Sequence, residues 1–243
     1  MKSKYLDETM KNSTPFRLAT YNIHRSLGVD GEFAPKRIAK VLETLDADIL
    51  GLQEVGWYHG KGQRINQFDF LREATGYEMV PGLVRDHENA CFGNALLTKY
   101  PVKSYACINL TIAGYAPRGA IQAILETKVG ELQVMVVHLG LTPWERYQQM
   151  KKIADLVRHN QSKRTIVMGD FNQWLQHTEA SSQITSLLPK QINELTFPTR
   201  LPVVRLDRMF MSANIELLKQ GTLKDETTKK ASDHFPLYAQ VVW

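Results

Sequence analysis

The stretch that decides the fold is "TIVMGDFN" at Thr165–Asn172, where an apolar run stops at a glycine followed by an acid, a phenylalanine and an amide. A short apolar run bounded by a turn signal is typical of a buried strand. A turn alone would explain Asp170 and Asn172, because both residue types tolerate turn geometry. A catalytic site at the end of the strand would also explain them, so the choice depends on the rest of the chain.

The composition is that of an ordinary globular protein, with 243 residues, 43% of them hydrophobic and 23% charged. No linker, low-complexity segment or internal repeat divides the chain. We therefore expect an N-terminal tail over residues 1–14 and a single domain over residues 15–243. The formal net charge of +5 favours anionic partners, but it does not choose among nucleic acid, phosphorylated metabolites and lipid head groups.

The cysteines and the apolar segments bear on where the protein works. Cys91 and Cys107 have no metal-type spacing, and two such residues suit a reducing compartment. The first 16 residues contain no apolar core of signal-peptide length, and no stretch approaches the ~18 apolar residues that a membrane span needs. We expect a cytoplasmic protein with no integral membrane segment.

Strand-like and helix-like segments alternate along the chain. Apolar residues at helical spacing predict a helix after Pro35, and the capping-box spacing of Thr142 and Glu145 predicts the start of another. Helices are expected over 35–45, 65–76 and 142–160, and strands over 16–23, 46–54, 93–101, 105–112, 119–128, 131–140, 164–170, 205–212 and 236–243. Mainly antiparallel strands interspersed with helices favour an α/β sandwich of two packed sheets with helices outside.

Polar side chains follow five of the apolar runs. The residues concerned are Asn22 with His24, Glu54, His138, Asp170 with Asn172, and Asp233 with His234 just before the last strand. Each of these alone is typical of a cap or a turn. Five such positions offering only Asn, Glu, Asp and His predict a shared rim, which is where α/β proteins bind ligands.

The residue types on this rim indicate a chemistry. Carboxylate and amide oxygens with few histidines suit a hard cation such as Mg²⁺ or Mn²⁺. The chain has no HExxH, no cysteine cluster, no GxSxG and no GxxxxGK[ST], which weighs against zinc proteolysis, serine hydrolysis and nucleotide-driven phosphoryl transfer. A hard metal with acids and histidines fits hydrolysis of a phosphate ester.

An ordered set of motifs resembles the endonuclease/exonuclease/phosphatase superfamily, of which deoxyribonuclease I is the familiar member. The motifs are "TYNIH", "LQEV", "GNALL", "VVHLG", "GDFN", "RLDRMF" and "SDHFP", and the match runs from about Arg17 to the C-terminus. The resemblance implies a four-layer α/β/β/α sandwich of two mixed, mainly antiparallel sheets. It also implies a divalent metal, Mg²⁺ or Mn²⁺, and cleavage of a phosphoester or phosphodiester.

The resemblance assigns roles to the residues that match these motifs. Glu54 is expected to be the main metal ligand, assisted by the amide of Asn22. Asp170 is expected to orient or deprotonate the attacking water, with Asn172 holding that acid and contacting phosphate.

Near the C-terminus, Asp207 is expected to orient the imidazole of His234 as a catalytic pair. Asp233 matches a ligand in the inner or outer shell of the metal. His138 matches a position where the family often has a histidine that acts on the phosphate or the leaving group, although other branches have tyrosine there. Arg118, in "PRGAI", matches a strand position that often carries a basic residue.

The chain also departs from particular branches of the superfamily. His24 replaces an acid of the abasic-site endonucleases, and we assign it with Arg118 to the substrate phosphate. The Trp-Cys-Asp-Arg run of the inositol-polyphosphate 5-phosphatases is absent, since the corresponding stretch is "VVRLDRMF". The chain is most similar to a compact bacterial branch with poorly defined substrates.

These residues predict a divalent-metal-dependent phosphodiesterase or nuclease that uses metal-assisted in-line attack of water on an anionic phosphate-containing substrate. The alternative enzyme is a phosphatase or a phospholipid or inositol phosphodiesterase with the same site. A third interpretation is a non-catalytic binding protein on the same fold. Such a binder should lack Glu54, Asp170 or His234, and this chain has all three.

Overall fold

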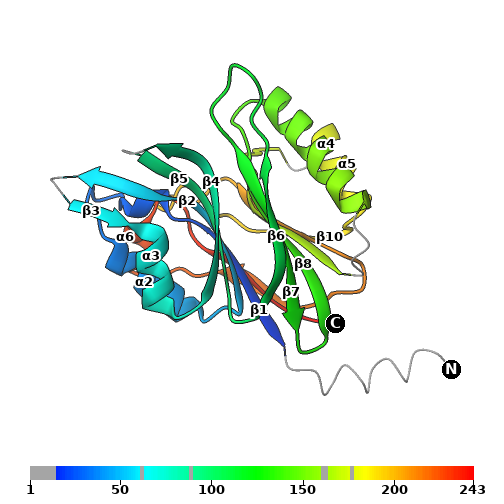
Figure 1. The fold of residues 1–243 in the computed structure, drawn as a ribbon, viewed down its shortest axis with the longest axis horizontal. Helices are drawn as coiled ribbons and strands as arrows, with labels where there is room; N and C mark the ends of the chain where they lie inside the picture. Colours follow the sequence, from blue (N-terminus) through cyan, green and yellow to red (C-terminus); the bar gives the residue numbers. More distant parts are fainter. Residues whose placement is uncertain (1–14, 61–62, 88–89, 160–163, 176–177) are drawn as a thin grey trace.

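The computed structural model describes residues 15–60, 63–87, 90–159, 164–175 and 178–243. The predicted N-terminal tail over residues 1–14 lies outside the described residues. Two sheets pack face to face, and helices cover both outer surfaces (Figure 1). This is the four-layer α/β/β/α sandwich that the motifs imply.

The first sheet has seven strands in the order β12-β13-β1-β2-β5-β4, with β3 paired to β2. The pairs β1–β13, β2–β5, β4–β5 and β12–β13 are antiparallel and β1–β2 is parallel, so the sheet is mixed. The strands are β1 (Phe16–Asn22), β2 (Ile49–Gly60), β3 (Gln63–Asn66), β4 (Glu78–His87), β5 (Ala90–Thr98), β12 (Glu216–Thr222) and β13 (Leu237–Val242).

The second sheet has six strands in the order β10-β11-β9-β8-β7-β6. Its one parallel pair is β8–β9, and its other pairs are antiparallel. The strands are β6 (Val102–Asn109), β7 (Gly119–Thr127), β8 (Gly130–His138), β9 (Thr165–Asp170), β10 (Lys190–Asn193) and β11 (Asp207–Met211).

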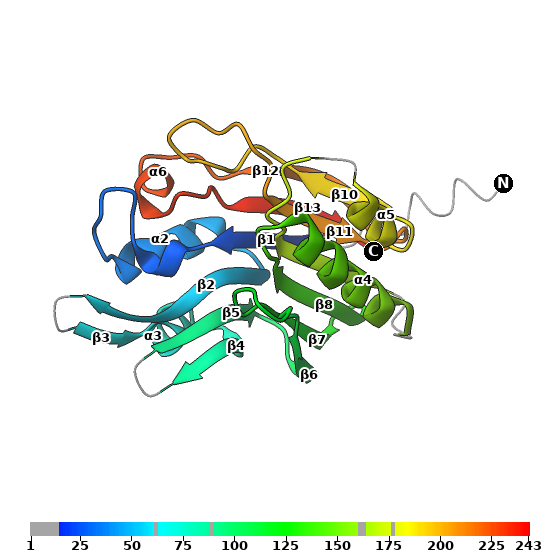
Figure 2. The same ribbon diagram turned by 90° about the horizontal axis from the view of Figure 1, so that it is seen from above.

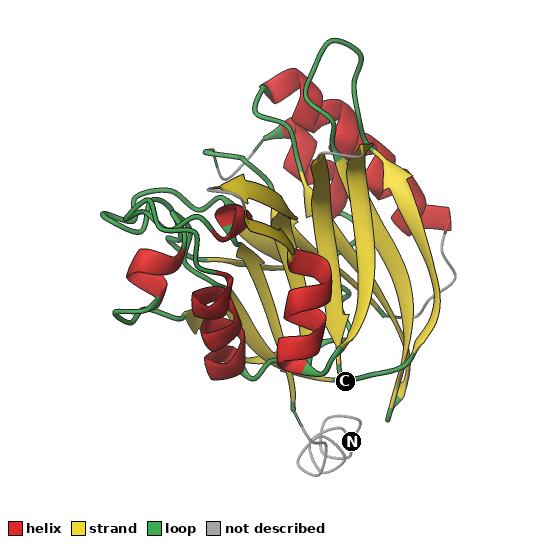
Figure 3. Cartoon of the chain, turned by 60° about the vertical axis from the view of Figure 1, so that its left-hand side comes forward, coloured by secondary structure: helices red, strands yellow, loops and turns green. Residues whose placement is uncertain are grey.

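The helices divide between the two outer faces, as Figures 2 and 3 show. Helices α2 (Pro35–Leu45), α3 (Gln67–Thr75) and α6 (Thr228–Ala231) lie on the first sheet, and α4 (Pro143–His159) and α5 (Glu179–Thr185) lie on the second. A short 3₁₀ helix, η1 (His24–Ser26), follows β1. No helix in the described part of the chain is long and apolar enough to cross a bilayer.

Both faces of the central strands are buried, which explains their continuous apolar runs. Along β8, Val136 faces the core between the sheets, whereas Met135 and Val137 face the core under α4 and α5. Along β1, Leu18 faces the inner core and Ala19 faces the helices α2 and α6. Burial of this apolar surface on both faces of each sheet is the main favourable contribution to folding.

The helix boundaries follow the predicted capping signals. The hydroxyl of Thr142 accepts a hydrogen bond from the backbone of Glu145 (3.3 Å), and the Glu145 carboxylate accepts one from the backbone of Thr142 (3.2 Å). Both halves of the predicted capping box are therefore present. Helix α3 ends at Gly76, whose φ of 69° is favourable for glycine.

Several elements have no counterpart in the sequence prediction. Strand β4 contains Pro81 and Gly82, which interrupt the pattern of a strand. Because β4 lies at the edge of the first sheet, the missing backbone donor of Pro81 is tolerated there. The short elements β3, β10, β12, α5 and α6 were also not predicted.

Candidate active site

The register of the second sheet brings three predicted site residues together. In the parallel pair β8–β9, His138 lies opposite Asp170, and in the antiparallel pair β9–β11, Asp170 lies opposite Asp207. All three side chains are buried. The end of β8, the end of β9 and the start of β11 therefore form one row at a single edge of the sheet.

Gly169 allows the two central strands to approach each other. Its φ of 152° is rarely adopted by other residues, and a Cβ placed on it would lie 1.9 Å from the carbonyl oxygen of Val137. The glycine of "GDFN" is thus required by the backbone. This requirement does not extend to the acid that follows, Asp170, whose side chain is available for catalysis.

Asn172 is held in an uncommon backbone conformation beside Asp170. Its φ is 49°, in the left-handed region that asparagine adopts more readily than most residues other than glycine. Its backbone N–H donates to Asp170 Oδ1 (2.8 Å), and its side-chain amide donates to the carbonyl of Leu139 (2.9 Å). These bonds fix the second predicted member of "GDFN" against the Asp170 carboxylate.

Asn22 connects the first sheet to this row. Its side-chain nitrogen donates to Asp170 Oδ2 (3.1 Å) and to Glu54 Oε1 (3.3 Å). The amide of Asn22 therefore lies between two carboxylates that come from different sheets. The predicted convergence of Asn22, Glu54 and Asp170 is present in the structure.

Glu54 does not end its strand, as its apolar run suggested, because β2 continues to Gly60. It lies at a bulge between Leu52 and Val55 and has a φ of 58°. A bulge bends a strand and redirects a side chain, which places this carboxylate on the rim. The guanidinium of Arg25 approaches it, with Nε 3.7 Å from Oε2.

His234 and Asp207 form the predicted pair. His234 Nδ1 lies 2.8 Å from Asp207 Oδ2, and His234 Nε2 lies 3.8 Å from Asp170 Oδ2. Burial lowers the pKa of His234, but the charges of Asp207, Asp170 and Asp233 and the hydrogen bond to Asp207 outweigh it and raise this pKa to about 10. His234 is therefore an imidazolium at neutral pH.

His138 is in the opposite charge state. Its Nε2 lies 3.6 Å from Asp170 Oδ2. Burial lowers the pKa of His138 to about 3, against the raising effect of Asp170 and with the positive charges of Arg118 and His234 adding to the decrease. The site thus holds one charged and one neutral histidine against a single carboxylate.

Asp233 and His24 form a separate pair at the flank of the site. His24 Nδ1 lies 3.9 Å from Asp233 Oδ1 and also hydrogen bonds to the carbonyl of Leu27 (2.9 Å). Among the residues that the structure describes, neither side chain hydrogen bonds or forms an ion pair with Glu54. The structure does not bring Asp233 into direct contact with the expected metal ligand.

Arg118 precedes β7 close to the row of catalytic candidates. Its charge acts on His138, as the lowered pKa of that histidine reflects. Its Nε is buried, and within the described ranges no hydrogen-bond partner is found for it. A buried guanidinium nitrogen without a partner is suited to bind an anion.

Sequence reasoning overlooked three residues at the site. Arg25 follows "TYNIH" directly, Ser232 opens "SDHFP", and Phe197 packs its ring 4.9 Å from that of His234. The Ser232 hydroxyl donates to the backbone carbonyl of Asn22 (2.7 Å) and so ties the last motif to the first. The first two residues lay within or beside the quoted motifs, whereas no sequence signal marked Phe197.

The donor set fits a hard cation that is only partly enclosed by protein. Two carboxylates lie on either side of the Asn22 amide, and these are oxygen donors of the kind that Mg²⁺ prefers. Within the described ranges, no three His, Cys, Asp or Glu side chains are grouped to hold a metal by themselves. This arrangement suits Mg²⁺, which keeps several waters and shares phosphate oxygens, better than an ion that needs a closed cage.

Comparisons with known proteins agree with this fold. The chain is 27% identical to the uncharacterized protein YbhP of Escherichia coli K12, over 97% of this chain and 98% of that protein. An endonuclease/exonuclease/phosphatase structure from Beutenbergia cavernae DSM 12333 has a TM-score of 0.77 at 20% identity, covering 94% of this chain and 72% of that one. A mannosyl-6-phosphatase from Bacteroides thetaiotaomicron VPI-5482 has a TM-score of 0.70 at 18% identity, covering 94% and 100%.

The family model described as "Endonuclease/Exonuclease/phosphatase family" matches residues 19–234, a range that begins within β1 and ends at His234. It therefore includes every candidate site residue. The protein belongs to the endonuclease/exonuclease/phosphatase family.

Proposed function

We propose that this protein is a divalent-metal-dependent hydrolase of phosphate esters, with a phosphodiester as the favoured substrate. The observation that supports this most strongly is the surrounding of Asp170. One of its oxygens lies 3.1, 3.6 and 3.8 Å from nitrogens of Asn22, His138 and His234, respectively. An acid held from three sides is suited to position a water molecule for in-line attack and to accept its proton.

The two histidines are suited to different tasks because their charges differ. His234 presents a positive charge beside Asp170, and we assign to it the stabilisation of negative charge that develops on the phosphate. Asp207 keeps that imidazolium charged and oriented through its hydrogen bond to Nδ1. His138 is neutral, and we assign to it a hydrogen bond to a phosphate oxygen.

The carboxylate of Glu54 would hold the Mg²⁺ or Mn²⁺ ion. The oxygen of the Asn22 amide accepts a hydrogen bond from the backbone N–H of His24 (3.0 Å), and its NH2 group faces Glu54 and Asp170, so Asn22 would position these carboxylates and not bind the cation itself. When bound, the cation would neutralise phosphate charge and polarise the phosphorus–oxygen bonds. Arg118 would contact the same phosphate, and Asn172 would keep Asp170 in place. In this proposal Asp233 and His24 lie in the outer part of the site. There they contact the metal through water molecules or contact the side of the substrate.

Space beside the site favours a diester over a monoester. A pocket of about 300 Å³ is lined by Arg118 and by Arg25, whose Nε lies 3.7 Å from Glu54 Oε2. The second substituent of a diester would find room there. The mannosyl-6-phosphatase with the same fold makes a phosphomonoester the alternative substrate.

The proposal extends to the setting of the enzyme. Residues 15–243 would form one catalytic domain. Among the described residues, neither Cys91 nor Cys107 is in a disulfide, which is typical of reducing compartments, and we place the enzyme in the cytoplasm.

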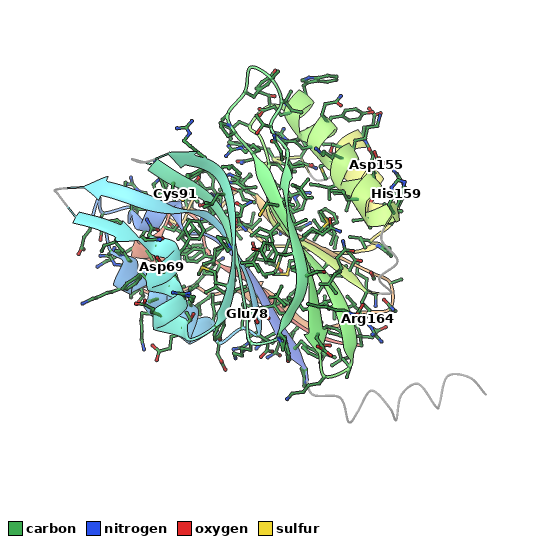
Figure 4. All side chains as sticks on the ribbon, viewed as in Figure 1. Asp69, Glu78, Cys91, Asp155, His159 and Arg164 are labelled. Carbon is green, nitrogen blue, oxygen red and sulfur yellow. The ribbon has the colours of Figure 1, made fainter. Side chains whose placement is uncertain are left out.

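The test is a substrate panel with purified protein and Mg²⁺ or Mn²⁺. It comprises plasmid DNA, single-stranded DNA, RNA, bis-p-nitrophenyl phosphate, p-nitrophenyl phosphate, phospholipids and inositol phosphates. We expect turnover of diesters that stops with EDTA and in Glu54→Ala and His234→Ala. The matched controls Glu73→Ala and His159→Ala change exposed residues on α3 and α4 and should keep full activity. Figure 4 shows Asp155 and His159 on α4, away from the first sheet.

Three outcomes would contradict the proposal. Turnover that persists in EDTA would remove the metal role. Hydrolysis of monoesters alone would replace the diester by the phosphatase alternative. No turnover of any member of the panel would favour a binding protein on this fold.

A further inference from the structure

A basic pocket lies next to the site, between the loop after β1, strands β4 and β5, and the loop before β7. It measures about 300 Å³, and its lining includes Arg25, Arg85, Arg118, Phe92 and Pro117. Three guanidinium groups from three distant parts of the sequence therefore line one cavity. None of them belongs to the row of His138, Asp170 and Asp207.

The described residues compensate the positive charge of this pocket poorly. None of those that line it is an aspartate or a glutamate. In the described part of the chain, neither Arg85 nor Arg118 has a carboxylate within ion-pair distance, and Arg25 reaches Glu54 only at 3.7 Å. Arg37, by contrast, has two carboxylates at 2.8 and 2.6 Å. Gathering like charges is unfavourable in the empty pocket and becomes favourable when an anion binds.

The pocket adjoins the proposed site of cleavage. Arg25 contacts the carboxylate expected to hold the metal, and the charge of Arg118 acts on His138. Arg85 lies on β4, one position beyond a register shift against β5, and is exposed. A ligand that spans the pocket would therefore place one group near Arg85 and a phosphate near Glu54.

We propose that Arg85, together with the guanidinium groups of Arg25 and Arg118, forms a second anion subsite. This subsite binds a phosphate group other than the one being cleaved. This inference rests on the proposed hydrolysis of phosphate esters and narrows the substrate to molecules that carry at least two phosphates. Arginine suits this task because its planar fork donates two hydrogen bonds to a phosphate. Phe92 and Pro117 give an apolar wall for the group that connects the two phosphates.

Binding is tested first, without metal and without turnover. Calorimetry in EDTA compares thymidine 3′,5′-bisphosphate with thymidine 5′-monophosphate on the wild type, on Arg85→Ala and on Arg158→Ala. We expect the wild type to bind the bisphosphate about tenfold more tightly than the monophosphate, since the monophosphate lacks the group that makes one charge-assisted hydrogen bond. In Arg85→Ala this ratio should fall to about one. Arg158→Ala removes the same charge from an exposed position on α4 and should keep the ratio.

A second pair, fructose 1,6-bisphosphate and fructose 6-phosphate, distinguishes the source of the phosphate. A preference in both pairs supports a subsite for phosphate as such. A preference in the thymidine pair alone supports a subsite for nucleotides. Equal binding of the mono- and bisphosphates to the wild type, or an equal loss of preference in Arg158→Ala, would overturn the subsite.

A turnover experiment separates this inference from the proposed function. It compares kcat/KM for the p-nitrophenyl ester of thymidine 5′-phosphate with and without a 3′-phosphate. We expect the ratio of the two values to be about ten in the wild type and about one in Arg85→Ala. No hydrolysis of either ester, together with a preserved binding preference, would overturn the hydrolase and leave the anion subsite standing. Hydrolysis with equal kcat/KM for both esters would overturn the subsite alone.

Discussion

The two sheets contribute to the candidate site in different ways. The second sheet supplies His138, Asp170 and Asp207 from regular strands in direct register, and all three are buried. The first sheet supplies Asn22 from a strand end, Glu54 from a bulge and Arg25 from a 3₁₀ turn. Of these, Asn22 is buried, whereas the Glu54 side chain is 21% exposed and that of Arg25 is 49% exposed.

This difference separates rigid chemistry from adaptable binding. Groups that transfer protons need fixed distances, and in-register strands within a packed core provide them. Groups that take up a hydrated cation and a substrate need access to solvent, which an irregular backbone at the rim provides. The second sheet is therefore expected to govern rate and the first to govern affinity.

The largest expected effect is that of Asp170→Asn, in the second sheet. Asparagine has nearly the same shape, but it cannot accept a proton from water, so kcat should fall by about 10³-fold or more. Steady-state kinetics on a responsive diester measure this. Asp155→Asn on the outer face of α4 is the matched control and should leave kcat unchanged. A decrease of less than tenfold would show that Asp170 does not handle the proton.

Asp207→Asn should lower kcat by about 10²-fold, because His234 loses the partner that keeps it charged and oriented. The affinity for metal, measured by calorimetry with Mn²⁺, should be unchanged. This variant tests the division of labour within the site directly. A large loss of metal affinity would mean that Asp207 acts on the cation and that the division is wrong.

Glu54→Gln, in the first sheet, should affect affinity more than rate. The amide is a weaker ligand than the carboxylate, so the Mg²⁺ concentration for half-maximal activity should rise by about 10- to 100-fold. Activity should recover largely at saturating Mg²⁺. Glu73→Gln on α3 is the control with no expected change. Failure of saturating metal to restore kcat would place Glu54 among the groups that govern rate.

The smallest expected effect is the change of folding stability with pH. His234 has a folded pKa of about 10, above its ordinary 6.5, so the stability that it contributes is complete below pH 6.5 and is lost as the pH rises toward 10. His138 has a folded pKa of about 3, so stability decreases as the pH falls from 6.5 toward 3.

Together these two histidines favour a maximum of Tm near pH 6.5, with a lower Tm on either side. Thermal unfolding over this range measures it. His138→Gln should flatten the acid side of the profile and His234→Gln the alkaline side, whereas His159→Gln should change neither. A flat profile for the wild type would show that the folded charge states of the histidines are not as assigned.

The sequence predicted the parts of the molecule that regular patterns govern. Burial on both faces made β8 and β9 readable as apolar runs, and the capping signals located α4. The family motifs led to the residues of the central row. Strand β4 was missed because its edge position tolerates Pro81, which pattern reasoning treats as a strand breaker.

The irregular half of the site was less predictable for the same physical reason. The bulge that directs Glu54 depends on pairing with β5, and the approach of Arg25 depends on a turn with positive φ angles. Neither is encoded in local periodicity. The contact between Phe197 and His234 joins residues of different loops and becomes visible only in three dimensions.

The amide of Asn22 bridges the two sheets of the sandwich. It spans a carboxylate of one sheet and a carboxylate of the other, so the gap between them is set by how closely the sheets pack. That packing is tight nearby, since a Cβ on Gly51 would lie 3.1 Å from the side chain of Val136. The volume of the apolar side chains between the sheets therefore sets the distance between the carboxylates of Glu54 and Asp170. Core residues that never touch the substrate can in this way change the geometry of the site.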